Sequence, residues 1–344
     1  MKTLIIGPSW VGDMVMSQSL YITLKEQQPD MELHVMAPRW CLPLLSRMPE
    51  VDHAIEMPLG HGDLNLRVRW KLGRMLKQQQ YQQAIILPNS LKSALIPLFA
   101  GIPTRTGWKG ESRYGLLNDL RRNKNAFPLM VERYLALAFP ASQMRSSVDL
   151  QGIPFPTLRV NSQQQQQALT RLALSLEQPV LGLCPGAEFG PAKRWPEQHY
   201  AEIAQRWIAA GGQVWIFGSN KDQSVSSAIQ KHLPAELQAS CHLLAGKTSL
   251  EEAIDLLAAC TKVVSNDSGL MHIAAAVKTP LVAVYGSTSP GYTPPLADKV
   301  QIVHTDIVCR PCFKRECPLG HLKCLKELPP DQVWQALNNL TDRV

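Results

Sequence analysis

The sequence predicts an α/β protein with two similar domains, each a parallel sheet wound with helices. Three observations favour this fold class: short β-branched runs alternate with amphipathic helical stretches, the alternation breaks around residues 151–162, and it then resumes. The length of 344 residues suits two domains of ordinary size. With 45% hydrophobic and 18% charged residues, the chain can fill two cores, which excludes a largely disordered protein.

The expected elements follow the chain in order. In the first half, strands are predicted at 3–6, 32–36, 53–57 and 83–87, and helical spacing covers 13–27 and 64–80. Two prolines and a glycine between 151 and 162 indicate a linker, so we place the domains at 1–155 and 156–344. Strands of the second half are predicted at 179–184, 213–217, 262–265 and 281–285, and a helix is expected at the C-terminus.

Hydropathy and charge limit where the protein can work. The longest strongly apolar run, residues 94–102, contains a proline and a glycine and is far shorter than the roughly 20 residues of a membrane span. The first apolar run is also too short for a secretion signal, so we expect a cytoplasmic protein. A formal net charge of +7 favours anionic partners.

The loop after the first predicted strand, residues 7–13, contains glycines that permit close backbone approach. Asp13 ends this loop, and from the local sequence alone it is best interpreted as the N-cap of the following helix. The glycine spacing is not the GxGxxG fingerprint, and no acidic residue ends the second strand, so a dehydrogenase is disfavoured.

Two further loops follow strands of the second half. Residues 184–196 place Gly186, Lys193 and Arg194 just before a helix, where backbone N–H groups and fixed positive charge favour an anion such as phosphate. Residues 265–272 are a good helix-capping sequence that also directs donors at whatever binds there. His272 lies one turn further on, and a lone histidine on an apolar helix is more often packed than reactive.

Four segments, in this order and at this spacing, carry a family resemblance: GPSWVGDMVMSQSL, LPNSLKSALIPLFAGIPTRTGWKGESRYGLLND, PGAEFGPAKRWP and NDSGLMHIAAA. They resemble glycosyltransferase family 9, the heptosyltransferases, over residues 1 to about 295. The resemblance implies a GT-B architecture, two Rossmann-like domains facing across a central cleft, with the sugar nucleotide on the C-terminal domain and the acceptor on the N-terminal domain. It also implies inverting transfer of L-glycero-D-manno-heptose from ADP-heptose to the first heptose of the lipopolysaccharide inner core, without a covalent intermediate.

The resemblance implies roles for single residues. Asp13 matches the acidic residue that would act as general base, and Lys193 matches the lysine that would bind the diphosphate and stabilise the leaving group. The ribose contact is left open, because Asn220 stands near the position where relatives have a glutamate and Asp222 follows it. The donor-binding residues expected on this basis are Gly186, Lys193, Arg194, Asn220, Asp222, Asp267, Ser268, Gly269 and His272.

The acceptor of such an enzyme carries acidic sugars and phosphates, which suits the basic stretch of the first half. Trp108 and Tyr114 are expected to pack on sugar faces. A charged run is most often only a solvated face, so each of these cations has a plain alternative explanation. The acceptor-binding residues expected are Ser9, Trp10, Gly12, Arg105, Lys109, Arg113 and Arg121.

A cysteine cluster remains outside these motifs, with Cys309, Cys312, Cys317 and Cys324 in the segment CRPCFKRECPLGHLKC. Clustered thiols in a cytosolic protein are typical of a structural zinc site, with four thiolates or with three thiolates and His321. The spacing is not that of a standard zinc ribbon, so disulfides and free thiols stay open. No cofactor is expected for the chemistry itself.

Two other functions compete with this interpretation. A family member that uses the same donor but accepts Kdo directly would differ only in its acceptor half, and GPSWVGDMVMSQSL favours the second transfer. A basic, cysteine-rich nucleic-acid-binding protein is the remote alternative, disfavoured because the chain lacks a recognition motif and has only 6% aromatic residues. The expected partners are ADP-heptose, a heptosylated Kdo-lipid A acceptor and the cytoplasmic leaflet of the inner membrane, bound peripherally, and not nucleic acid. We expect a monomer.

Overall fold

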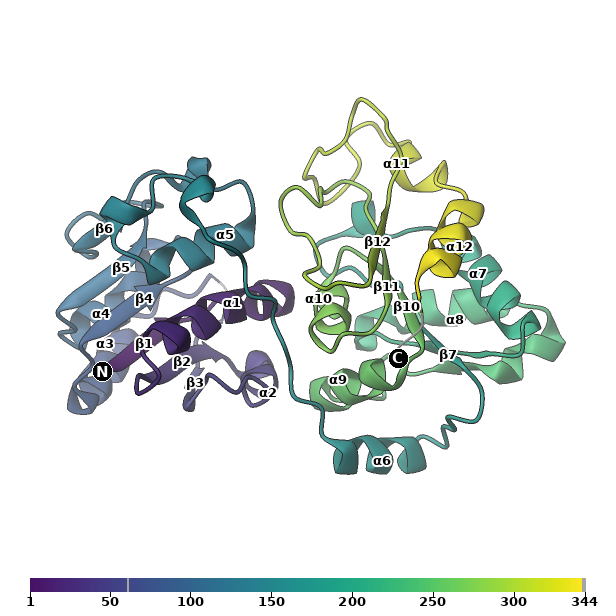
Figure 1. The fold of residues 1–344 in the computed structure, drawn as a ribbon, viewed down its shortest axis with the longest axis horizontal. Helices are drawn as coiled ribbons and strands as arrows, with labels where there is room; N and C mark the ends of the chain where they lie inside the picture. Colours follow the sequence, from purple (N-terminus) through teal and green to yellow (C-terminus); the bar gives the residue numbers. More distant parts are fainter. Residues whose placement is uncertain (61, 342–344) are drawn as a thin grey trace. The chain divides into compact units, whose positions relative to one another are not determined.

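The computed structural model describes residues 1–60 and 62–341 and divides into two compact units, Met1–Pro156 and Thr157–Val344 (Figure 1). Each unit contains one six-stranded sheet in which every paired strand is parallel. The predicted α/β class with parallel sheets is therefore confirmed. No helix in the described part of the chain is long and apolar enough to cross a membrane.

The sheet of the first unit has the order β3-β2-β1-β4-β5-β6. Central β1 pairs with β2 on one side and β4 on the other, with Ile5 opposite Val35 and Ile85. Buried β-branched and aliphatic residues fill these three strands, as expected for a parallel sheet covered on both faces. The strands are β1 (Lys2–Ile6), β2 (Glu32–Pro38), β3 (His53–Met57), β4 (Gln83–Ile86), β5 (Thr104–Trp108) and β6 (Asp119–Arg121).

Helical segments lie between the parallel strands along the chain and connect them. The first, α1, begins two residues earlier than predicted, and α3 occupies the middle of the predicted 64–80 stretch. α1 packs with α5, whereas α3 packs with α4, and the core under α3 and α4 includes Leu4, Ile86 and Ile96. The helices are α1 (Val11–Gln27), α2 (Leu42–Leu45), α3 (Leu66–Leu76), α4 (Leu95–Phe99) and α5 (Met130–Leu135).

The second sheet has the order β12-β11-β10-β7-β8-β9, so its central pair is β7 and β10. Leu183 lies opposite Ile216 of β8, and Val264 of β10 also lies opposite Leu183. The strands are β7 (Val180–Cys184), β8 (Gln213–Ile216), β9 (Cys241–Leu243), β10 (Lys262–Asn266), β11 (Leu281–Val284) and β12 (Val300–Val303).

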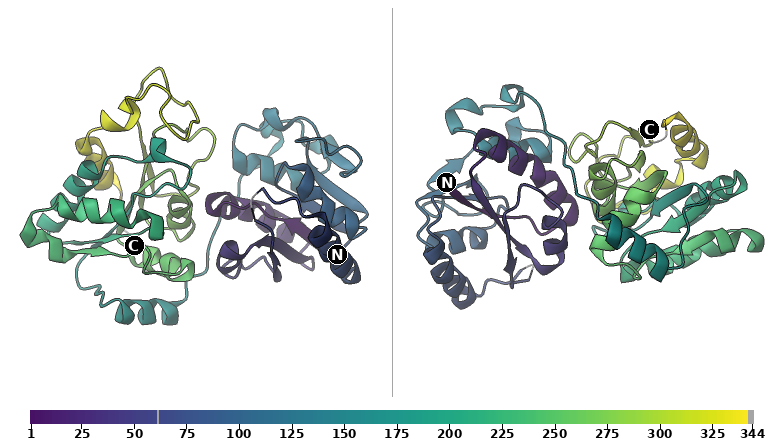
Figure 2. Two further views of the ribbon diagram at one scale, coloured as in Figure 1. Left: turned by 180° about the vertical axis from the view of Figure 1, so that it is seen from behind. Right: turned by 60° about the horizontal axis from the view of Figure 1, so that its bottom comes forward.

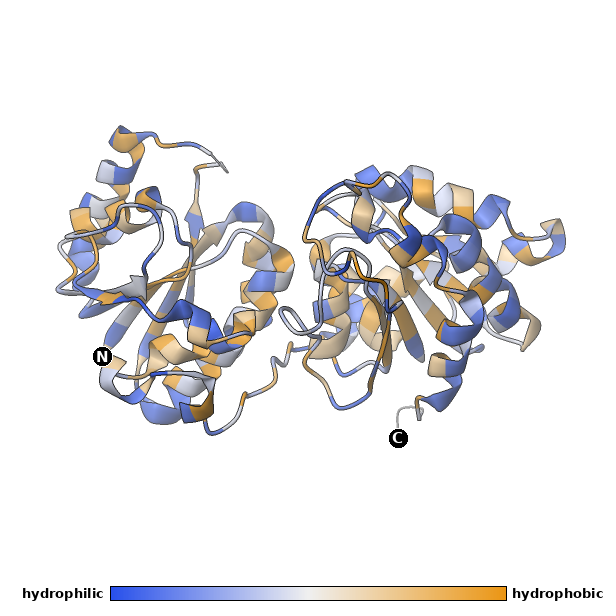
Figure 3. Cartoon of the chain, turned by 90° about the horizontal axis from the view of Figure 1, so that it is seen from above, coloured by the Kyte–Doolittle hydropathy of each residue, from blue (hydrophilic) through white to orange (hydrophobic). Residues whose placement is uncertain are grey.

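Two groups of helices cover the faces of this sheet (Figure 2). α7 packs with α8 and with α12, which is the predicted C-terminal helix, and their core contains Trp195, Tyr200 and Leu337. α9 packs with α6 and α10. Hydrophilic and hydrophobic residues alternate along the helices of both units (Figure 3). The helices are α6 (Ser162–Arg171), α7 (Glu197–Ala209), α8 (Gln223–Lys231), α9 (Leu250–Ala259), α10 (Gly269–Ala276), α11 (Lys323–Lys326) and α12 (Pro330–Asn339).

Both sheets have a topological switch point, where successive connections leave two neighbouring strands in opposite directions. In the first unit it lies between β1 and β4, and in the second between β7 and β10. Ligands of open parallel sheets bind outside the carboxyl ends of the strands at this point. The loops singled out from the sequence after β1, β7 and β10 all lie at these two positions.

Candidate functional site

At the switch point of the second unit, the loops after β7 and β10 meet through an ion pair. Lys193 ends the short 3-10 turn Pro191–Lys193, and its Nζ lies 2.7 Å from Oδ2 of Asp267. Asp267 follows directly after β10 and is buried, and Lys193 is half-buried. The two residues are 74 positions apart in the sequence, and the pairing of β7 with β10 brings their loops together.

Further groups hold this pair in place. The hydroxyl of Thr288 donates to the same Oδ2 of Asp267 over 2.5 Å. On the other side, Nζ of Lys193 lies 5.0 Å from the centroid of the Phe189 ring, within the range of a cation–π contact. The ammonium group is therefore fixed between a carboxylate and an aromatic face, which gives the site a preorganised positive charge. Neither Thr288 nor Phe189 was predicted, because nothing local in the sequence marks them as partners of the lysine.

Asn266 ties the two loops together and was also missed as a single residue. Its Oδ1 accepts hydrogen bonds from the backbone N–H of Trp195 and from the hydroxyl of Tyr200, and its Nδ2 donates to the carbonyl of Pro185 over 2.5 Å. The side chain is fully buried, so these bonds replace all contact with water. The sequence did contain a hint of this residue, because Asn266 begins the motif NDSG. Only the three residues that follow it were predicted to bind the donor.

The start of α10 confirms the predicted cap. Ser268 is the N-cap, and its hydroxyl accepts from the N–H of Met271, while Gly269 is the first helical residue. His272 lies one turn on and is buried, and burial lowers its pKa to about 4. The imidazole is therefore neutral near pH 7, and it can donate a hydrogen bond only from its one N–H.

Asp222 supports the loop around Gly186 from behind. A Cβ built on Gly186 would lie 2.6 Å from the Asp222 carboxyl carbon, so this close approach requires glycine. Oδ2 of Asp222 accepts from the N–H and the hydroxyl of Ser219, and Oδ1 lies 3.7 Å from an Arg194 nitrogen. Of the two residues considered for the ribose, Asp222 is thus buried in loop contacts, whereas Asn220 is exposed.

In the first unit, the loop after β1 leads straight into α1. Trp10 is the N-cap and makes no side-chain capping bond, so the interpretation of Asp13 as the N-cap is wrong. Asp13 is instead the third residue of the helix and is half-buried in its first turn. The positive end of the helix dipole favours a negatively charged side chain at this position.

Trp40 joins this loop from the end of β2, a contact that the sequence did not predict. Its indole N–H donates to the carbonyl of Ser9 over 2.9 Å. The side chains of Trp10 and Trp40 nevertheless stay 42% and 51% exposed. Exposed indole rings are suited to packing on the apolar face of a sugar.

The basic stretch after β4 is only partly available to a ligand. Arg105 donates to the carbonyls of Leu116 and Ile102, and Arg121 pairs with Asp119 and donates to the carbonyl of Phe139. These two guanidinium groups stabilise the fold of their own segment.

Arg113 is only 1% exposed and donates to the carbonyls of Pro88 and Trp108. Burial lowers the pKa of its guanidinium to about 10. The expectation that Trp108 packs on a sugar is wrong, because its ring is buried and its N–H donates to the carbonyl of Arg133. Lys109 is exposed, with its Nζ 5.9 Å from the centroid of the exposed Tyr114 ring.

The cysteine cluster lines one pocket of the second unit. Its walls include Arg310, His321 and the four thiols of Cys309, Cys312, Cys317 and Cys324. All of these cysteines are free of disulfides. The Sγ of Cys317 accepts from the N–H of Leu322 over 3.5 Å, and backbone N–H groups here lower the pKa of this thiol. Within 1–60 and 62–341, however, no three ligand atoms of the cluster lie within 4.8 Å of one another.

The same segment supports the lysine loop. The carbonyl of Arg315 accepts from the N–H of Ala192, and the carbonyl of Ala192 accepts from the N–H of Ser287. A Cβ on Gly190 would lie 2.5 Å from that Arg315 carbonyl oxygen. The cysteine-rich segment is therefore packed directly against the turn that positions Lys193.

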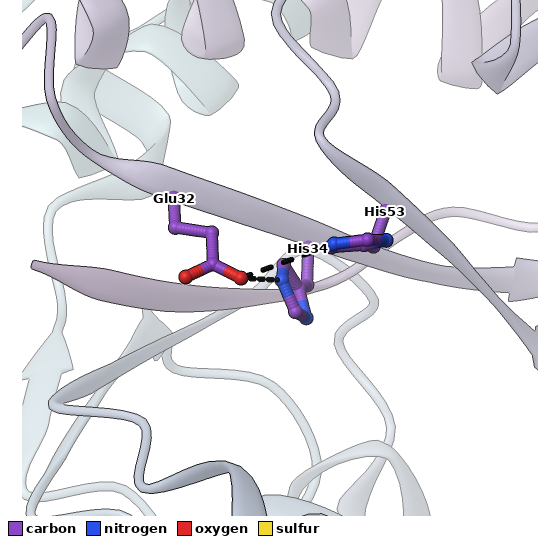
Figure 4. A group of neighbouring side chains, drawn as sticks. All are labelled: Glu32, His34 and His53. Atoms are coloured by element: carbon purple, nitrogen blue, oxygen red, sulfur yellow. Dashed lines mark hydrogen bonds and ion pairs between the residues drawn. The ribbon is translucent and has the colours of Figure 1, made fainter.

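A second possible cation site lies in the first unit, at the amino ends of β2 and β3 and so away from the switch-point loops. Glu32, His34 and His53 converge there (Figure 4). Oε1 of Glu32 lies 2.8 Å from Nε2 of His34 and 3.9 Å from Nε2 of His53. The ammonium group of Lys2 lies 3.1 Å from the same oxygen, and its bound positive charge opposes a metal cation there. The group is explained as an ion-pair network at the amino ends of the strands.

Comparisons with known proteins identify one enzyme family. The model of "Glycosyltransferase family 9 (heptosyltransferase)" matches residues 69–323. The chain is 53% identical to lipopolysaccharide heptosyltransferase 2 of Escherichia coli K12, over 99% of this chain and 98% of that protein. It is equally similar to lipooligosaccharide heptosyltransferase 2 of Haemophilus influenzae, with 99% of both chains covered. The solved structure of E. coli ADP-heptose LPS heptosyltransferase II superposes with a TM-score of 0.88 at 51% identity, covering 98% of each chain.

Proposed function

The chain belongs to glycosyltransferase family 9 and has its GT-B fold, and from this premise we propose that it adds the second heptose of the lipopolysaccharide inner core. In this reaction L-glycero-D-manno-heptose moves from ADP-heptose to the first heptose of the acceptor, with inversion at the anomeric carbon. The observation that carries the proposal is 53% identity, over essentially the whole chain, to enzymes named for this transfer.

The second unit supplies the donor half. Departure of ADP places growing negative charge on the diphosphate, and Lys193, fixed by Asp267 and Phe189, offers it a preorganised cation. The backbone N–H groups at the start of α10, beside Ser268 and Gly269, form the positive end of the helix dipole and offer further hydrogen-bond donors to the diphosphate. Asp267 is itself an anion, so its part is to hold the lysine rather than to bind phosphate.

The exposure and charge of further residues in the second unit suggest how they contact the sugar nucleotide. Gly186 lets the backbone approach the ligand closely, and neutral His272 can donate one hydrogen bond to a phosphate oxygen. Arg194, the next residue along the chain, adds a second cation, with one of its nitrogens 3.7 Å from Oδ1 of Asp222. Asn220 is the better candidate for the ribose hydroxyls, because it is exposed whereas Asp222 is buried in the loop.

The first unit supplies the acceptor half. Asp13 takes the proton of the acceptor hydroxyl as its oxygen attacks the anomeric carbon, and the bond to the ADP oxygen breaks as the new glycosidic bond forms. Ser9, Trp10 and Gly12 belong to the same loop and first helical turn as Asp13, and we propose that they contact the acceptor. Lys109 is the exposed cation available to acidic groups of the acceptor, and Arg105, Arg113 and Arg121 act by holding the fold of that segment.

We further propose that the protein works as a monomer on the cytoplasmic side of the inner membrane, bound peripherally, where a Kdo-lipid A acceptor would be anchored. The net charge of +7 favours an anionic leaflet. The chemistry described needs no cofactor. A structural zinc at Cys309, Cys312, Cys317 and Cys324 stays a prediction, and an ion there would require the thiols to approach one another.

ADP release by the purified protein tests the acceptor. We expect release with ADP-heptose and an acceptor that already carries one heptose, and none with an acceptor that ends in Kdo. Release with the Kdo-ended acceptor alone would keep the donor chemistry but assign the first transfer. Release with neither acceptor would contradict the transferase function.

A further inference from the structure

Helix α3 presents an unusual outer face in which large apolar side chains stand exposed. Leu66, Trp70 and Met75 are 52%, 53% and 55% exposed. Trp70 is as exposed as Trp40 of the same unit, which is 51% exposed. Three large exposed apolar residues on one short helix are more than the scattered single ones normal on a protein surface.

The inner face of α3 already fixes the helix to its unit. Leu76 belongs to the core, and Gly73 packs so closely on α4 that a Cβ there would lie 2.4 Å from Cβ of Phe99. The buried Arg69 donates to the carbonyls of Leu64 and Lys92. The helix is therefore held rigidly from within, and its exposed face is not needed for the fold.

Cations occupy the outer half of the helix, between Leu66 and Trp70 toward one edge and Met75 at the other. Arg67, Lys71, Arg74 and Lys77 are exposed and recur every three or four positions, which places them on one side of the helix. The guanidinium of Arg74 lies 5.9 Å from the Trp70 ring centroid. No aspartate or glutamate occurs between residues 64 and 110, so the charge of this stretch has a single sign.

We propose that the outer side of α3 and of the 3-10 turn Lys77–Gln79 that follows it docks on the surface of an anionic phospholipid bilayer through Leu66, Trp70, Met75, Arg67, Lys71, Arg74 and Lys77. Basic side chains are attracted to anionic headgroups, and exposed apolar side chains, tryptophan above all, enter the boundary between headgroups and acyl chains. The inference rests on the proposed function in one respect only, that the acceptor is anchored by lipid.

An acidic protein partner or the phosphates of the acceptor would account for the cations alone. Neither of these partners explains why Leu66, Trp70 and Met75 are exposed beside the cations. A bilayer explains both, because its headgroups bind the cations and its interface accommodates the apolar side chains. The charge and the apolar residues together therefore favour lipid.

Sedimentation with vesicles tests the proposal directly on the full-length protein. We expect binding to vesicles of phosphatidylethanolamine and phosphatidylglycerol, weakened by salt, and little binding to phosphatidylcholine. The triple variant R67Q/K71Q/R74Q should lower the partition coefficient about a hundredfold, since each cation near an anionic surface contributes roughly fivefold. A matched control, K231Q/K278Q/K326Q, removes three exposed cations of the second unit and should bind like the wild type.

The apolar contribution has its own variant, Trp70→Ser, which should lower binding about tenfold at every salt concentration. Circular dichroism and unchanged unfolding midpoints show that a variant is folded. Equal binding of the α3 variants and the control variant to anionic vesicles would overturn the proposal.

Activity assays separate this inference from the proposed function. With a soluble core oligosaccharide that lacks acyl chains, the α3 variants should release ADP at the wild-type rate, and with the acceptor embedded in vesicles they should be slower. A loss of activity on the soluble acceptor would mean that the face binds sugar or phosphate, which contradicts membrane docking. If the wild type transfers to neither acceptor but still binds anionic vesicles through α3, the proposed function fails and the docking surface stands.

Discussion

The ammonium group of Lys193 lies 2.7 Å from the buried carboxylate of Asp267, and this ion pair joins the two loops that follow the central strands of the second sheet. The carboxylate of Asp267 also accepts a hydrogen bond from Thr288, which fixes its position. The fixed carboxylate in turn holds the ammonium group in place before any ligand binds. A diphosphate that binds here meets a charge whose position needs no rearrangement, which is how electrostatic stabilisation of a leaving group is most effective.

Replacing Lys193 by alanine should lower kcat/KM for ADP-heptose by about a hundredfold to a thousandfold, since it removes a cation aimed at the leaving group. The matched control is Lys221→Ala, which removes an exposed lysine paired with Glu188 near the same loop and should change kcat/KM little. Steady-state ADP release measures both. Equal losses in the two variants would remove Lys193 from the donor site.

Asp13→Asn should reduce turnover by about a hundredfold or more while leaving ADP-heptose affinity nearly unchanged, because the amide cannot accept the acceptor proton. Asp30→Asn, a change of the same kind at the exposed loop after α1, should behave like the wild type. Calorimetric donor titration and single-turnover assays separate binding from chemistry. Near-normal turnover of Asp13→Asn would mean that the carboxylate only stabilises the start of the helix.

His272 makes stability depend on pH. Its folded pKa of about 4 lies below the ordinary value of about 6.5, so the unfolded chain binds the proton more readily between these values. The associated stability, on the order of 3 kcal/mol, is fully present above pH 6.5 and is lost as the pH falls toward 4. Urea unfolding at pH 7.5 and pH 5 should show a smaller loss for His272→Gln than for the wild type. The same loss in both proteins would contradict this assignment.

Gly186→Ala should destabilise the second unit by about 1–3 kcal/mol, because its Cβ would lie 2.6 Å from the Asp222 carboxyl carbon and force the loop apart. The KM for ADP-heptose should rise with it. Gly291→Ala is the control, since the nearest atom to a Cβ there is a serine hydroxyl oxygen at 3.2 Å. Thermal unfolding and donor kinetics compare the two, and an unchanged Gly186→Ala would show that the loop yields freely.

Elemental analysis of protein purified without chelators tests the cysteine cluster. If these thiols bind structural zinc, the wild type should contain about one zinc per chain, and Cys309→Ser/Cys312→Ser should lose it. Cys41→Ser/Cys260→Ser changes two buried core thiols instead and should keep the metal. Wild-type protein without zinc but with full activity would leave the cluster as free thiols.

The strongest strands could be predicted because each is a continuous buried run, as in β1, β7 and β11. The strands β5, β6, β9 and β12 were not predicted, since residues such as Thr104 and Asp119 form no apolar run and become strands only by pairing with a neighbour. The loops at the carboxyl ends could be recognised because their glycines and charges interrupt the apolar pattern.

By itself the sequence determined the α/β class, the loops at the carboxyl ends of the strands where we propose the chemistry, and, through its motifs, the family. Only the tertiary structure decided which of the predicted charges can meet a ligand. Strand order places Lys193 beside Asp267, and packing buries Arg113 and turns Arg121 toward Asp119. The physical reason is that residue type specifies what a side chain can bind, whereas its partner and its exposure depend on contacts between segments far apart in the chain.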